Sequence, residues 1–380
     1  MTPLRILLVG DYPDDPRLGS SKVAHKLREE FRAAGHECDA LFAGDIGARP
    51  VGRQLRQLVA PIMANAAIAA AHHRRAYDVV DAASAEGLWF GARRAARQFR
   101  RTAFICRSHG LEHLNYARML DDSAAGITSK PWTRRIWYPV SRLSQVAAAA
   151  RLADRLILLN HRDKAYAISR GWQPENCIDV IPHGVSDVFL AAGAPQPRGA
   201  GALFCGSWDH MKGIRYLVDA FTALARNGGA VPLTVLGAGV PAAQVLASFP
   251  ETVRPRVTVI DKVSEDRVLA EFRRHDVLIA PSTYEGFGLV IIEAMSQGLP
   301  VIATPYGAAA LVVRDGITGR IVPPRDAGAI ASAVESLMRN ADQRARLGAN
   351  AAKAVSEMSW RSTAQRTVES YRRALDTIRS

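Results

Sequence analysis

The sequence predicts an α/β protein with two doubly wound parallel-sheet domains in tandem, and three observations lead to that prediction. Short apolar runs of strand length recur along the chain, amphipathic segments of helix length separate them, and this rhythm occurs twice. Runs that are apolar on both faces are typical of parallel strands buried beneath helices. A length of 380 residues also suits two domains, each with its own core.

The predicted strands form two sets along the chain. The first set comprises residues 6–9, 38–42, 77–80, 103–106, 156–159 and 178–181. The second set comprises residues 202–205, 233–236, 257–260, 277–280, 300–303 and 321–322. Residues 22–34 are expected to form a helix that ends at Gly35, and a last helix, at 363–378, follows an interruption near Trp360.

A segment rich in Gly, Pro and Ala, residues 191–201, separates the two sets of strands. Such composition is typical of a connection between domains rather than of a helix or strand. We therefore expect a first Rossmann-like domain over residues 1–193 and a second over residues 200–361.

The composition excludes several classes of protein. Hydrophobic residues make up 48% and charged residues 22%, which argues against a disordered chain. The longest apolar stretch, residues 58–71, is interrupted by Pro61 and is too short to span a membrane. The N-terminus shows no signal-peptide pattern. The chain has four cysteines, which are far apart in the sequence: Cys38, Cys106, Cys177 and Cys205. None forms a C-x-x-C pair, which predicts reduced thiols, no zinc site and a cytoplasmic protein.

The charge balance favours anionic partners. The chain has 49 Lys and Arg against 36 Asp and Glu, a formal net charge of +13. Three stretches of the first half contain no acidic residue: 46–77, 87–111 and 123–153. The third combines basic residues with Trp132, Trp137 and Tyr138. Two interpretations stay open: an interface for a lipid headgroup layer or a phosphorylated acceptor, and an ordinary solvated helix face.

Residues 281–295 contain the most informative chemistry. A predicted strand leads into a Pro/Gly turn, and a helix begins near Gly288, which is where ligands bind in open α/β sheets. Glycines let a ligand approach the backbone, and the first turn of a helix offers N–H groups to a phosphate. Glu285 precedes that turn and Glu293 lies eight residues further on, and both carboxylates can accept hydrogen bonds from hydroxyls. The pattern favours a sugar nucleotide.

This stretch resembles the E-x7-E motif of the retaining family 4 glycosyltransferases, which have the GT-B fold. The resemblance covers nearly the whole chain, and further segments match the family's recurring ones: Asn160, residues 180–185, Lys212-Gly213, Gly307, residues 315–319 and residues 322–324. It implies two Rossmann-like domains facing a central cleft. It also implies that the last helix, residues 362–380, crosses back to the first domain.

The resemblance implies a role for each matching residue. Glu285 would contact donor-sugar hydroxyls, Glu293 the ribose hydroxyls, and Lys212 the diphosphate leaving group. His109, which follows a strand of the first domain, would orient a hydroxyl of the donor sugar. We expect His109, Glu285 and Lys212 to be catalytic, and we expect the donor to contact Gly206, Ser207, Lys212, Gly237, Lys262, Val263, Glu285, Gly286, Phe287, Gly288, Leu289, Val290 and Glu293.

Each of these assignments has a structural alternative. Glu293 could be a surface carboxylate in an ion pair, Lys212 a solvated lysine and His109 a purely structural histidine. The segment Gly237-Ala238-Gly239 is by itself a weak phosphate signal.

The chain departs from the family pattern at three places. Ser207 stands where many members have a phosphate-binding Arg, and Lys262 or an Arg of the first domain would have to replace that charge. Gly19 is followed by Ser20 where relatives often have a glycine pair in a loop that contacts phosphate or acceptor; Ser20 or Ser21 could instead cap a helix. Ala308 and Leu311 occupy positions where a glycine and a glutamate are usual.

The resemblance therefore implies a retaining glycosyltransferase that moves a sugar from a UDP- or GDP-sugar to a hydroxyl of a carbohydrate, lipid-linked or small-molecule acceptor. Synthesis of cell-surface polysaccharide, lipopolysaccharide or glycolipid is the expected setting. No D-x-D pair occurs in the donor region, so we predict no metal and no cofactor. We expect no nucleic-acid partner, and a peripheral contact between the basic first domain and the inner face of the plasma membrane stays open.

Two alternatives belong to other classes. A sugar-nucleotide epimerase on a similar frame would act on the donor alone. A non-catalytic protein that binds nucleic acid or lipid would use the positive charge, but it would leave the Glu, Gly and Lys pattern unexplained.

Overall fold

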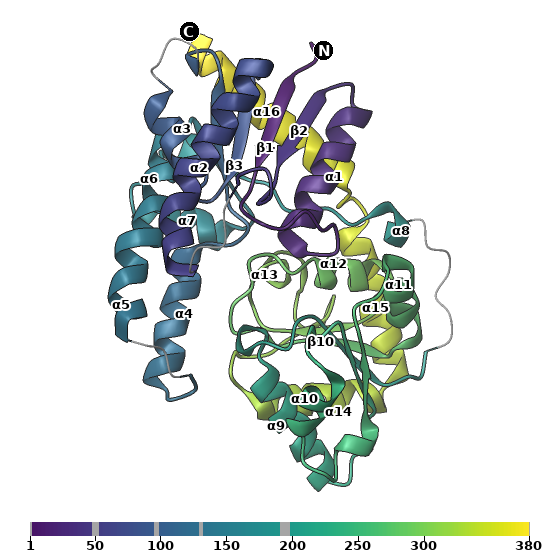
Figure 1. Cartoon of the computed structure of the whole chain (residues 1–380). Helices are drawn as coiled ribbons and strands as arrows, with labels where there is room; N and C mark the ends of the chain where they lie inside the picture. The colour runs from purple at the N-terminus through teal and green to yellow at the C-terminus, as the bar shows by residue number, and fades with distance from the viewer. Residues whose placement is uncertain (1, 48–52, 95–98, 129–131, 191–197, 380) are drawn as a thin grey trace. The chain divides into compact units, whose positions relative to one another are not determined.

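The structure, a computed structural model, describes residues 2–47, 53–94, 99–128, 132–190 and 198–379. Its contacts divide the chain into two compact units, which are coloured by residue number in Figure 1. The first unit is Met1–His183 together with Trp360–Ser380, and the second is Gly184–Ser359.

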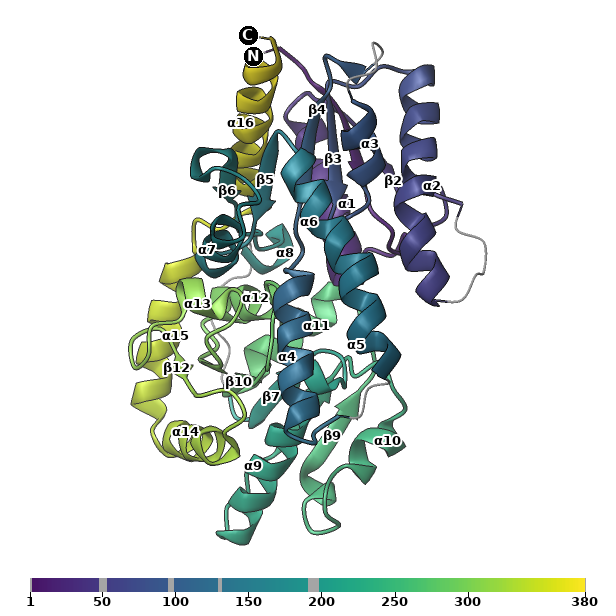
Figure 2. The ribbon, with the colours of Figure 1, turned by 90° about the vertical axis from the view of Figure 1, so that its left-hand side faces the viewer.

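The first unit contains a six-stranded parallel sheet of order β2-β1-β3-β4-β5-β6. Its strands are β1 (Arg5–Val9), β2 (Glu37–Leu41), β3 (Val79–Ala83), β4 (Ala103–Arg107), β5 (Arg155–Leu158) and β6 (Ile178–Val180). The helices are α1 (Gly19–Ala33), α2 (Arg53–Arg74), α3 (Leu88–Arg93), α4 (Glu112–Ala124), α5 (Trp132–Tyr138), the π-helix η2 (Pro139–Leu143), α6 (Ser144–Leu152), α7 (His161–Ser169) and α16 (Trp360–Arg379). Helices α1 and α16 pack together on one face, and α2, α3 and α6 on the other (Figures 1 and 2).

The second unit contains another six-stranded parallel sheet, of order β12-β11-β10-β7-β8-β9. Its strands are β7 (Ala202–Cys205), β8 (Leu233–Leu236), β9 (Val257–Ile260), β10 (Val277–Ala280), β11 (Val301–Ala303) and β12 (Arg320–Ile321). The helices are α8 (Asp187–Leu190), α9 (Ile214–Arg226), α10 (Ala242–Ala247), α11 (Glu265–Arg274), α12 (Leu289–Ser296), α13 (Ala309–Val312), α14 (Ala327–Arg339) and α15 (Ala341–Val355). The predicted fold class is confirmed.

Each sheet has one point where the strand order reverses. In the first sheet the chain runs outward in opposite directions from β1 and β3, and in the second from β7 and β10. Loops that leave adjacent strands at such a point diverge to opposite faces and open a crevice at the carboxyl edge, where α/β proteins bind ligands. The fold therefore directs attention to the loops after β1, β3, β7 and β10.

Two of the element boundaries that differ from the predictions have a clear physical reason. Strand β3 was expected to end at residue 80 but continues to Ala83, because the charge of Asp81 is neutralised inside the protein by Arg107. Helix α1 begins at Gly19 rather than at residue 22, and its N-cap residue is Leu18. The interpretation of Ser20 or Ser21 as the cap is wrong: the Ser21 hydroxyl instead accepts a hydrogen bond from the Asp15 amide, at 3.1 Å.

The first crossing between the units falls earlier in the chain than the predicted boundary between residues 193 and 200. Helix α8 packs within the second unit, where the Phe189 ring lies 5.8 Å from that of Phe272 and the Val185 amide donates to the Met358 carbonyl. The chain returns at Trp360 and α16 packs on the first sheet. Residues 191–197 of the predicted linker lie outside the described residues.

Two further sequence expectations concern the membrane and the cysteines. In the part of the chain that the structure describes, every helix is too short or too polar to cross a bilayer. All four cysteines fall in that part and are free thiols, as predicted.

Candidate functional site

The loops after β7 and β10 in the second unit are fastened to each other. The Thr283 amide donates to the Met211 carbonyl at 2.8 Å, and the Thr283 hydroxyl donates to the same oxygen at 3.3 Å. Gly213 follows Met211 by two residues with φ +73°, and a Cβ at this position would overlap the carbonyl oxygen of Pro281. Only glycine allows both the left-handed backbone and this close approach. The two loops at the reversal point of the sheet thus form one rigid assembly.

This assembly holds an ion pair between the two candidate catalytic residues of the second unit. Lys212, the last residue of a 3-10 turn at His210–Lys212, places Nζ 2.6 Å from Oε2 of Glu285. The Ser282 hydroxyl donates to the same Glu285 oxygen at 3.2 Å. The Lys212 and Glu285 side chains are 22% and 12% exposed, so both can reach a ligand. The sequence predicted each residue separately, and the fold brings them together.

The turn from Glu285 to Gly288 is clamped in place before α12. Gly288 adopts φ +80° as the N-cap residue, and the Ala308 amide donates to the Phe287 carbonyl at 2.6 Å. Gly307 supports this turn from the loop after β11, because a Cβ there would overlap the Phe287 carbonyl oxygen. Leu289 and Val290 then supply the first turn of α12, whose free N–H groups suit a phosphate.

Glu293 lies on α12 and is only 6% exposed. This burial speaks against a carboxylate on a solvated helix face, while the alternative of an ion pair stays open. Glu293 lies in the second turn of α12, directly after the first turn, whose N–H groups suit a phosphate. Its carboxylate is well placed to accept hydrogen bonds from a ligand that extends along the helix.

The remaining expected donor residues lie on the loops after β7, β8 and β9. Gly237 has φ +73° and open space where a Cβ would be, and Gly206 donates its amide to the Leu236 carbonyl. Ser207 is exposed and Val263 is half-buried. Lys262 is exposed, has no ion-pair partner among the described residues, and comes within 3.8 Å of the position of a Gly239 Cβ. Lys262 therefore stays a candidate to replace the arginine that many members of the family have where this chain has Ser207.

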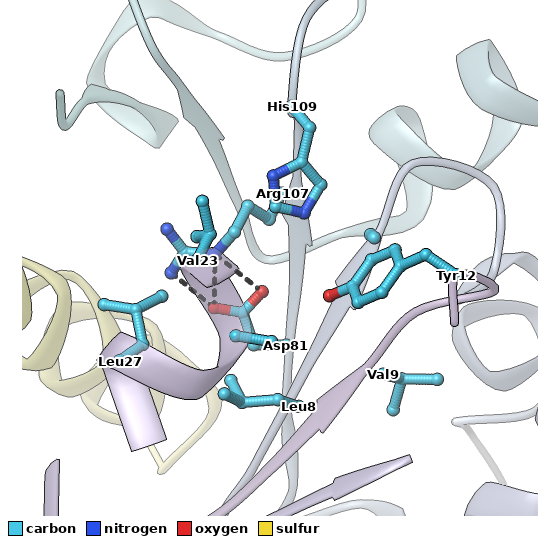
Figure 3. Close-up of a pocket in the computed structure, with 10 residues that line it drawn as sticks. Leu8, Val9, Tyr12, Val23, Leu27, Asp81, Arg107 and His109 are labelled. Atoms are coloured by element: carbon cyan, nitrogen blue, oxygen red, sulfur yellow. Dashed lines mark hydrogen bonds and ion pairs between the residues drawn. The ribbon is translucent and has the colours of Figure 1, made fainter. Parts of the chain in front are cut away.

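The first unit has a buried charged cluster at the carboxyl ends of β3 and β4 (Figure 3). The Arg107 guanidinium donates to both carboxylate oxygens of Asp81 at 2.5 to 3.1 Å, and the Tyr371 hydroxyl of α16 donates to Asp81 as well. The two ionised side chains are 4% and 1% exposed. A buried charge pair needs hydrogen bonds to offset its desolvation, and those to Asp81 fix α16 against the first sheet, although Nη1 of Arg107 is buried without a partner among the described residues.

His109 lies two residues beyond β4 and beside this cluster. Its ring meets that of Tyr12 edge-on at 5.7 Å and lies 6.2 Å from that of His183. Burial and the nearby Arg107 charge lower the pKa of His109 to about 4, because both disfavour the imidazolium. Among the described residues, Nδ1 of His109 is buried without a hydrogen-bond partner. A neutral ring of this kind can orient a hydroxyl but does not supply a positive charge.

A small cavity adjoins His109. Tyr12, Asp81, Arg107 and His109 line its polar part, as Figure 3 shows, and apolar side chains close the rest. Its volume is about 10 Å³, which is room for about one water molecule. The cavity is thus too small for a sugar, and the buried residues that line it hold His109 in place.

A second charged cluster, which the sequence did not predict, joins the loop after β3, at the reversal point of the first sheet, to the start of α4 and to η2. Arg142 of η2 contacts Glu86 at 2.9 Å and Glu112 at 3.2 Å, and the Ser84 hydroxyl donates to Glu112. Ser84 has φ +53°, a strained value for a residue other than glycine. Strained residues and π-helices often mark functional sites, so these loops are a candidate acceptor region.

The structure does not test two of the expectations: that the loop at Gly19 and Ser20 contacts phosphate or acceptor, and that the reaction needs no metal. Gly19 and Ser20 lie in the first turn of α1, with open space beside Gly19. Within the described residues, no group of three or more His, Cys, Asp and Glu side chains is arranged to hold a metal ion. The metal-independence of the reaction stays a prediction.

Buried neutral histidines predict a loss of stability in acid. Burial lowers the pKa of both His109 and His113 to about 4, so the unfolded state binds more protons as pH falls below the ordinary value of 6.5. The stabilisation that is present above about pH 6.5 is therefore lost as pH falls toward 4, by about 1.4 kcal/mol for His109 at about pH 5.5 and by less for His113, which is partly exposed to solvent. Urea unfolding at about pH 7.5 and 5.5 measures this loss. In the His109→Asn/His113→Asn variant the loss of stability between these two pH values should be smaller by about 1–3 kcal/mol, and His73→Asn, at an exposed position, is the control.

Removal of the Tyr371 hydroxyl tests the charged cluster. Tyr371→Phe leaves Asp81 with one donor fewer in a buried site, and we expect the free energy of unfolding to fall by about 1–3 kcal/mol. Glu369→Gln, on the exposed side of the same helix, is the matched control. Equal stability of the two variants in urea unfolding would show that the cluster does not anchor α16.

Two parallel six-stranded sheets, each with its loops gathered at a reversal point, define the architecture of the GT-B glycosyltransferases. The solved structure of sucrose-phosphate synthase from Thermosynechococcus elongatus has this architecture, with a TM-score of 0.79 and 23% identity over 98% of this chain and 99% of that chain. The solved structure of HepE from Anabaena, in complex with UDP, gives a TM-score of 0.70 and 16% identity over 97% of this chain and 100% of that one.

Comparison with family models gives the family. Residues 18–188 match the model described as Glycosyltransferase Family 4, and residues 200–340 match the model described as Glycosyl transferases group 1. These two matches together take in most of the chain, and the chain belongs to the family 4 glycosyltransferases.

Two curated relatives are 34% and 29% identical to this chain over the residues that align. A phosphatidyl-myo-inositol mannosyltransferase from Mycobacterium leprae is 34% identical over 215 residues, which are 54% of this chain and 56% of the relative. A D-inositol 3-phosphate glycosyltransferase from Nocardia farcinica is 29% identical over 259 residues, which are 62% of this chain and 56% of the relative. The matches thus span little more than half the length of these relatives.

Proposed function

We propose that this protein is a retaining, metal-independent glycosyltransferase that uses a UDP- or GDP-sugar. The observation that supports it best is the preformed Lys212–Glu285 pair beside the start of α12, at the reversal point of the second sheet. This arrangement places a cation and free N–H groups for a diphosphate next to carboxylates for sugar hydroxyls. The structural neighbour from Anabaena was solved with UDP and with UDP-glucose, which supports the same class of donor here.

In the proposed reaction, the bond between the anomeric carbon and the diphosphate oxygen breaks, and the acceptor oxygen bonds to that carbon on the same face. The acceptor's proton passes to the departing phosphate oxygen, so no protein nucleophile is required. Lys212 and the first turn of α12 stabilise the negative charge that develops on the leaving group. Glu285 and Glu293 hold sugar and ribose hydroxyls, and His109, neutral at pH 7, orients a hydroxyl of the sugar.

The acceptor is proposed to be a polyol or phosphorylated polyol. Two of the curated relatives are named for inositol-containing acceptors, and the first unit of this chain carries most of the acid-free basic stretches. Its Ser84, after β3, and Glu112, at the start of α4, supply hydroxyl-binding groups next to the reversal point of the first sheet.

The first experiment is a thermal-shift screen with UDP-glucose, UDP-galactose and GDP-mannose, followed by turnover assays with myo-inositol and its 3-phosphate. A ligand at about 100 times its Kd stabilises the folded state by about 2.7 kcal/mol, enough to select the donor. NMR of the product then gives the anomeric configuration. We expect a retained configuration and full activity after treatment with EDTA.

Each competing hypothesis gives a different result. A nucleotide-sugar isomer formed without acceptor would identify an epimerase. Tight, salt-sensitive binding to RNA without affinity for any nucleotide sugar would identify a non-catalytic binding protein. Loss of activity in EDTA and its recovery with Mn²⁺ would contradict metal independence, and an inverted product would contradict the front-face reaction.

A further inference from the structure

A second, larger cavity lies on the first unit, between α4, α6 and α7. These helices are on the same flank of the unit in Figure 2. The cavity has a volume of about 380 Å³, within the range of small-molecule sites. Its walls are mostly apolar or aromatic, and ten residues line it: His113, Tyr116, Ala117, Leu120, Leu143, Ala147, Arg151, Tyr166, Arg170 and Trp172.

The aromatic side chains that line the cavity are held in place by contacts with one another. Trp172 is buried and lies edge-on to both His113, at 4.8 Å, and Tyr166, at 5.7 Å. Another lining residue, Tyr116, stacks on Tyr138 at 5.6 Å. A preformed apolar cavity of this size exposes surface that an aliphatic or aromatic body would remove from water.

The residues that line the cavity carry positive charge, which no acidic lining residue neutralises. Arg151 and Arg170 line it, no acidic residue does, and neither arginine has a carboxylate partner among the described residues. Arg170 lies over the Tyr166 ring at 5.2 Å, and Arg151 donates to the Arg170 carbonyl at 3.3 Å. Two guanidinium groups that line one cavity favour a phosphate, whose oxygens accept their paired donors.

His113 adds an unused polar atom. Its Nδ1 is buried without a hydrogen-bond partner among the described residues. Burial and the charges of Arg170 and Arg151 lower the pKa of His113 to about 4, so its ring is neutral at pH 7 and serves as a hydrogen-bonding group.

The surface next to the cavity favours an aliphatic ligand. Tyr116 also donates its hydroxyl to the Arg135 carbonyl of α5, so the cavity wall is joined to the segment formed by α5 and η2. That segment exposes three large apolar side chains, Ile136 (62%), Trp137 (41%) and Val140 (70%), among basic residues. An exposed apolar group of this kind, with basic neighbours, is typical of contact with lipid.

We propose that this cavity is a binding site for the phosphate monoester of an aliphatic alcohol. Arg151 and Arg170 bind the phosphate, and the walls formed by Leu120, Leu143 and Trp172 enclose the first part of the chain. The site lies wholly within the first unit and requires no sugar donor. The proposal goes beyond the function proposed above, since it can hold or fail independently of donor binding.

Isothermal titration of the full chain, without nucleotide, tests the proposal with three probes: geranyl phosphate, geraniol and inorganic phosphate. We expect geranyl phosphate to bind at least about tenfold more tightly than either of the others, because each lacks one half of the recognition. If inorganic phosphate binds as tightly as geranyl phosphate, the cavity is only an anion site. If geraniol does, the cavity is only an apolar pocket. If no probe binds, the cavity is not a binding site for this class of ligand. Each of these results would overturn the proposal.

Variants locate the binding. Arg170→Gln should weaken geranyl phosphate binding about tenfold or more, and Arg151→Gln/Arg170→Gln further. Arg93→Gln, an exposed arginine of the same unit outside the cavity, is the control and should bind normally. Ala117→Trp fills the cavity from an exposed position that should not affect folding, and it should abolish binding. Undiminished binding in Ala117→Trp or in the double arginine variant would contradict the assignment, while unchanged donor-dependent thermal shifts would show that the donor site is intact.

Discussion

Lys212→Met is expected to lower kcat/KM for the sugar donor by about 100- to 1000-fold, the loss typical of removing one preorganised group that stabilises a developing anion. Lys212 is the cation that the folded chain places beside Glu285, at the point where the loops after β7 and β10 meet. Methionine keeps most of the side-chain volume and removes only the charge. Steady-state kinetics with the donor selected by thermal shift measures the loss, and the exposed Lys353→Met of α15 is the control.

A double-variant cycle separates a ligand role from a structural one. If Lys212 and Glu285 only stabilise each other, then Lys212→Met/Glu285→Leu should be no worse than either single variant, because the unpaired charge left by each single change is gone. If both contact the donor, the double variant should lose more activity than either single one. We expect the second result, with nearly unchanged thermal stability of the unliganded protein.

Gly213→Ala is expected to destabilise the second unit strongly, although it adds only one methyl group. The added Cβ would overlap the Pro281 carbonyl oxygen, and φ +73° is in addition unfavourable for alanine. We expect the free energy of unfolding to fall by about 3 kcal/mol or more, because the backbone of one loop must move away from the other. Donor binding should be lost as well, since Lys212 directly precedes this glycine.

Gly228→Ala is the matched control at the other end of the same helix, α9. Gly228 has φ +77°, almost the value of Gly213, but no atom lies within 4 Å of its potential Cβ. Its substitution should cost only about 1–2 kcal/mol, the strain of the left-handed backbone. Equal destabilisation of the two variants in denaturant unfolding would show that the contact between the loops after β7 and β10 contributes nothing to the free energy of unfolding.

The fold was predictable because its signal is repeated and local. Each strand of a parallel sheet buried on both faces is a short continuous apolar run, and every predicted run became a strand. The prediction was wrong where a charge sits inside a strand: Asp81 ends the apolar pattern of β3, but Arg107 and Tyr371, distant in sequence, neutralise it. The start of α1 was misplaced because its N-cap, Leu18, has no capping side chain that the sequence could reveal.

The candidate site was predictable where glycine and carboxylate positions follow a motif, and not where the partners come from separate loops. Glu285, Lys212 and Gly288 were expected from their local pattern, and the structure places them at one reversal point. The Arg142 cluster with Glu86 and Glu112 gave no such signal, since its members are spread over more than fifty residues and Arg142 stood in a basic stretch. The one available clue to the Asp81 cluster was an aspartate in the middle of an apolar run.

A crystal structure of the protein with bound UDP would decide whether the start of α12 and its neighbouring loop form the donor site. We predict the diphosphate between the loops after β7 and β10, with an oxygen within hydrogen-bond distance of Lys212 or of the first amides of α12, and the ribose hydroxyls on Glu293. A nucleotide bound elsewhere in the second unit, with Lys212 and Glu285 still paired only to each other and Glu293 without contact to it, would contradict the proposed donor site.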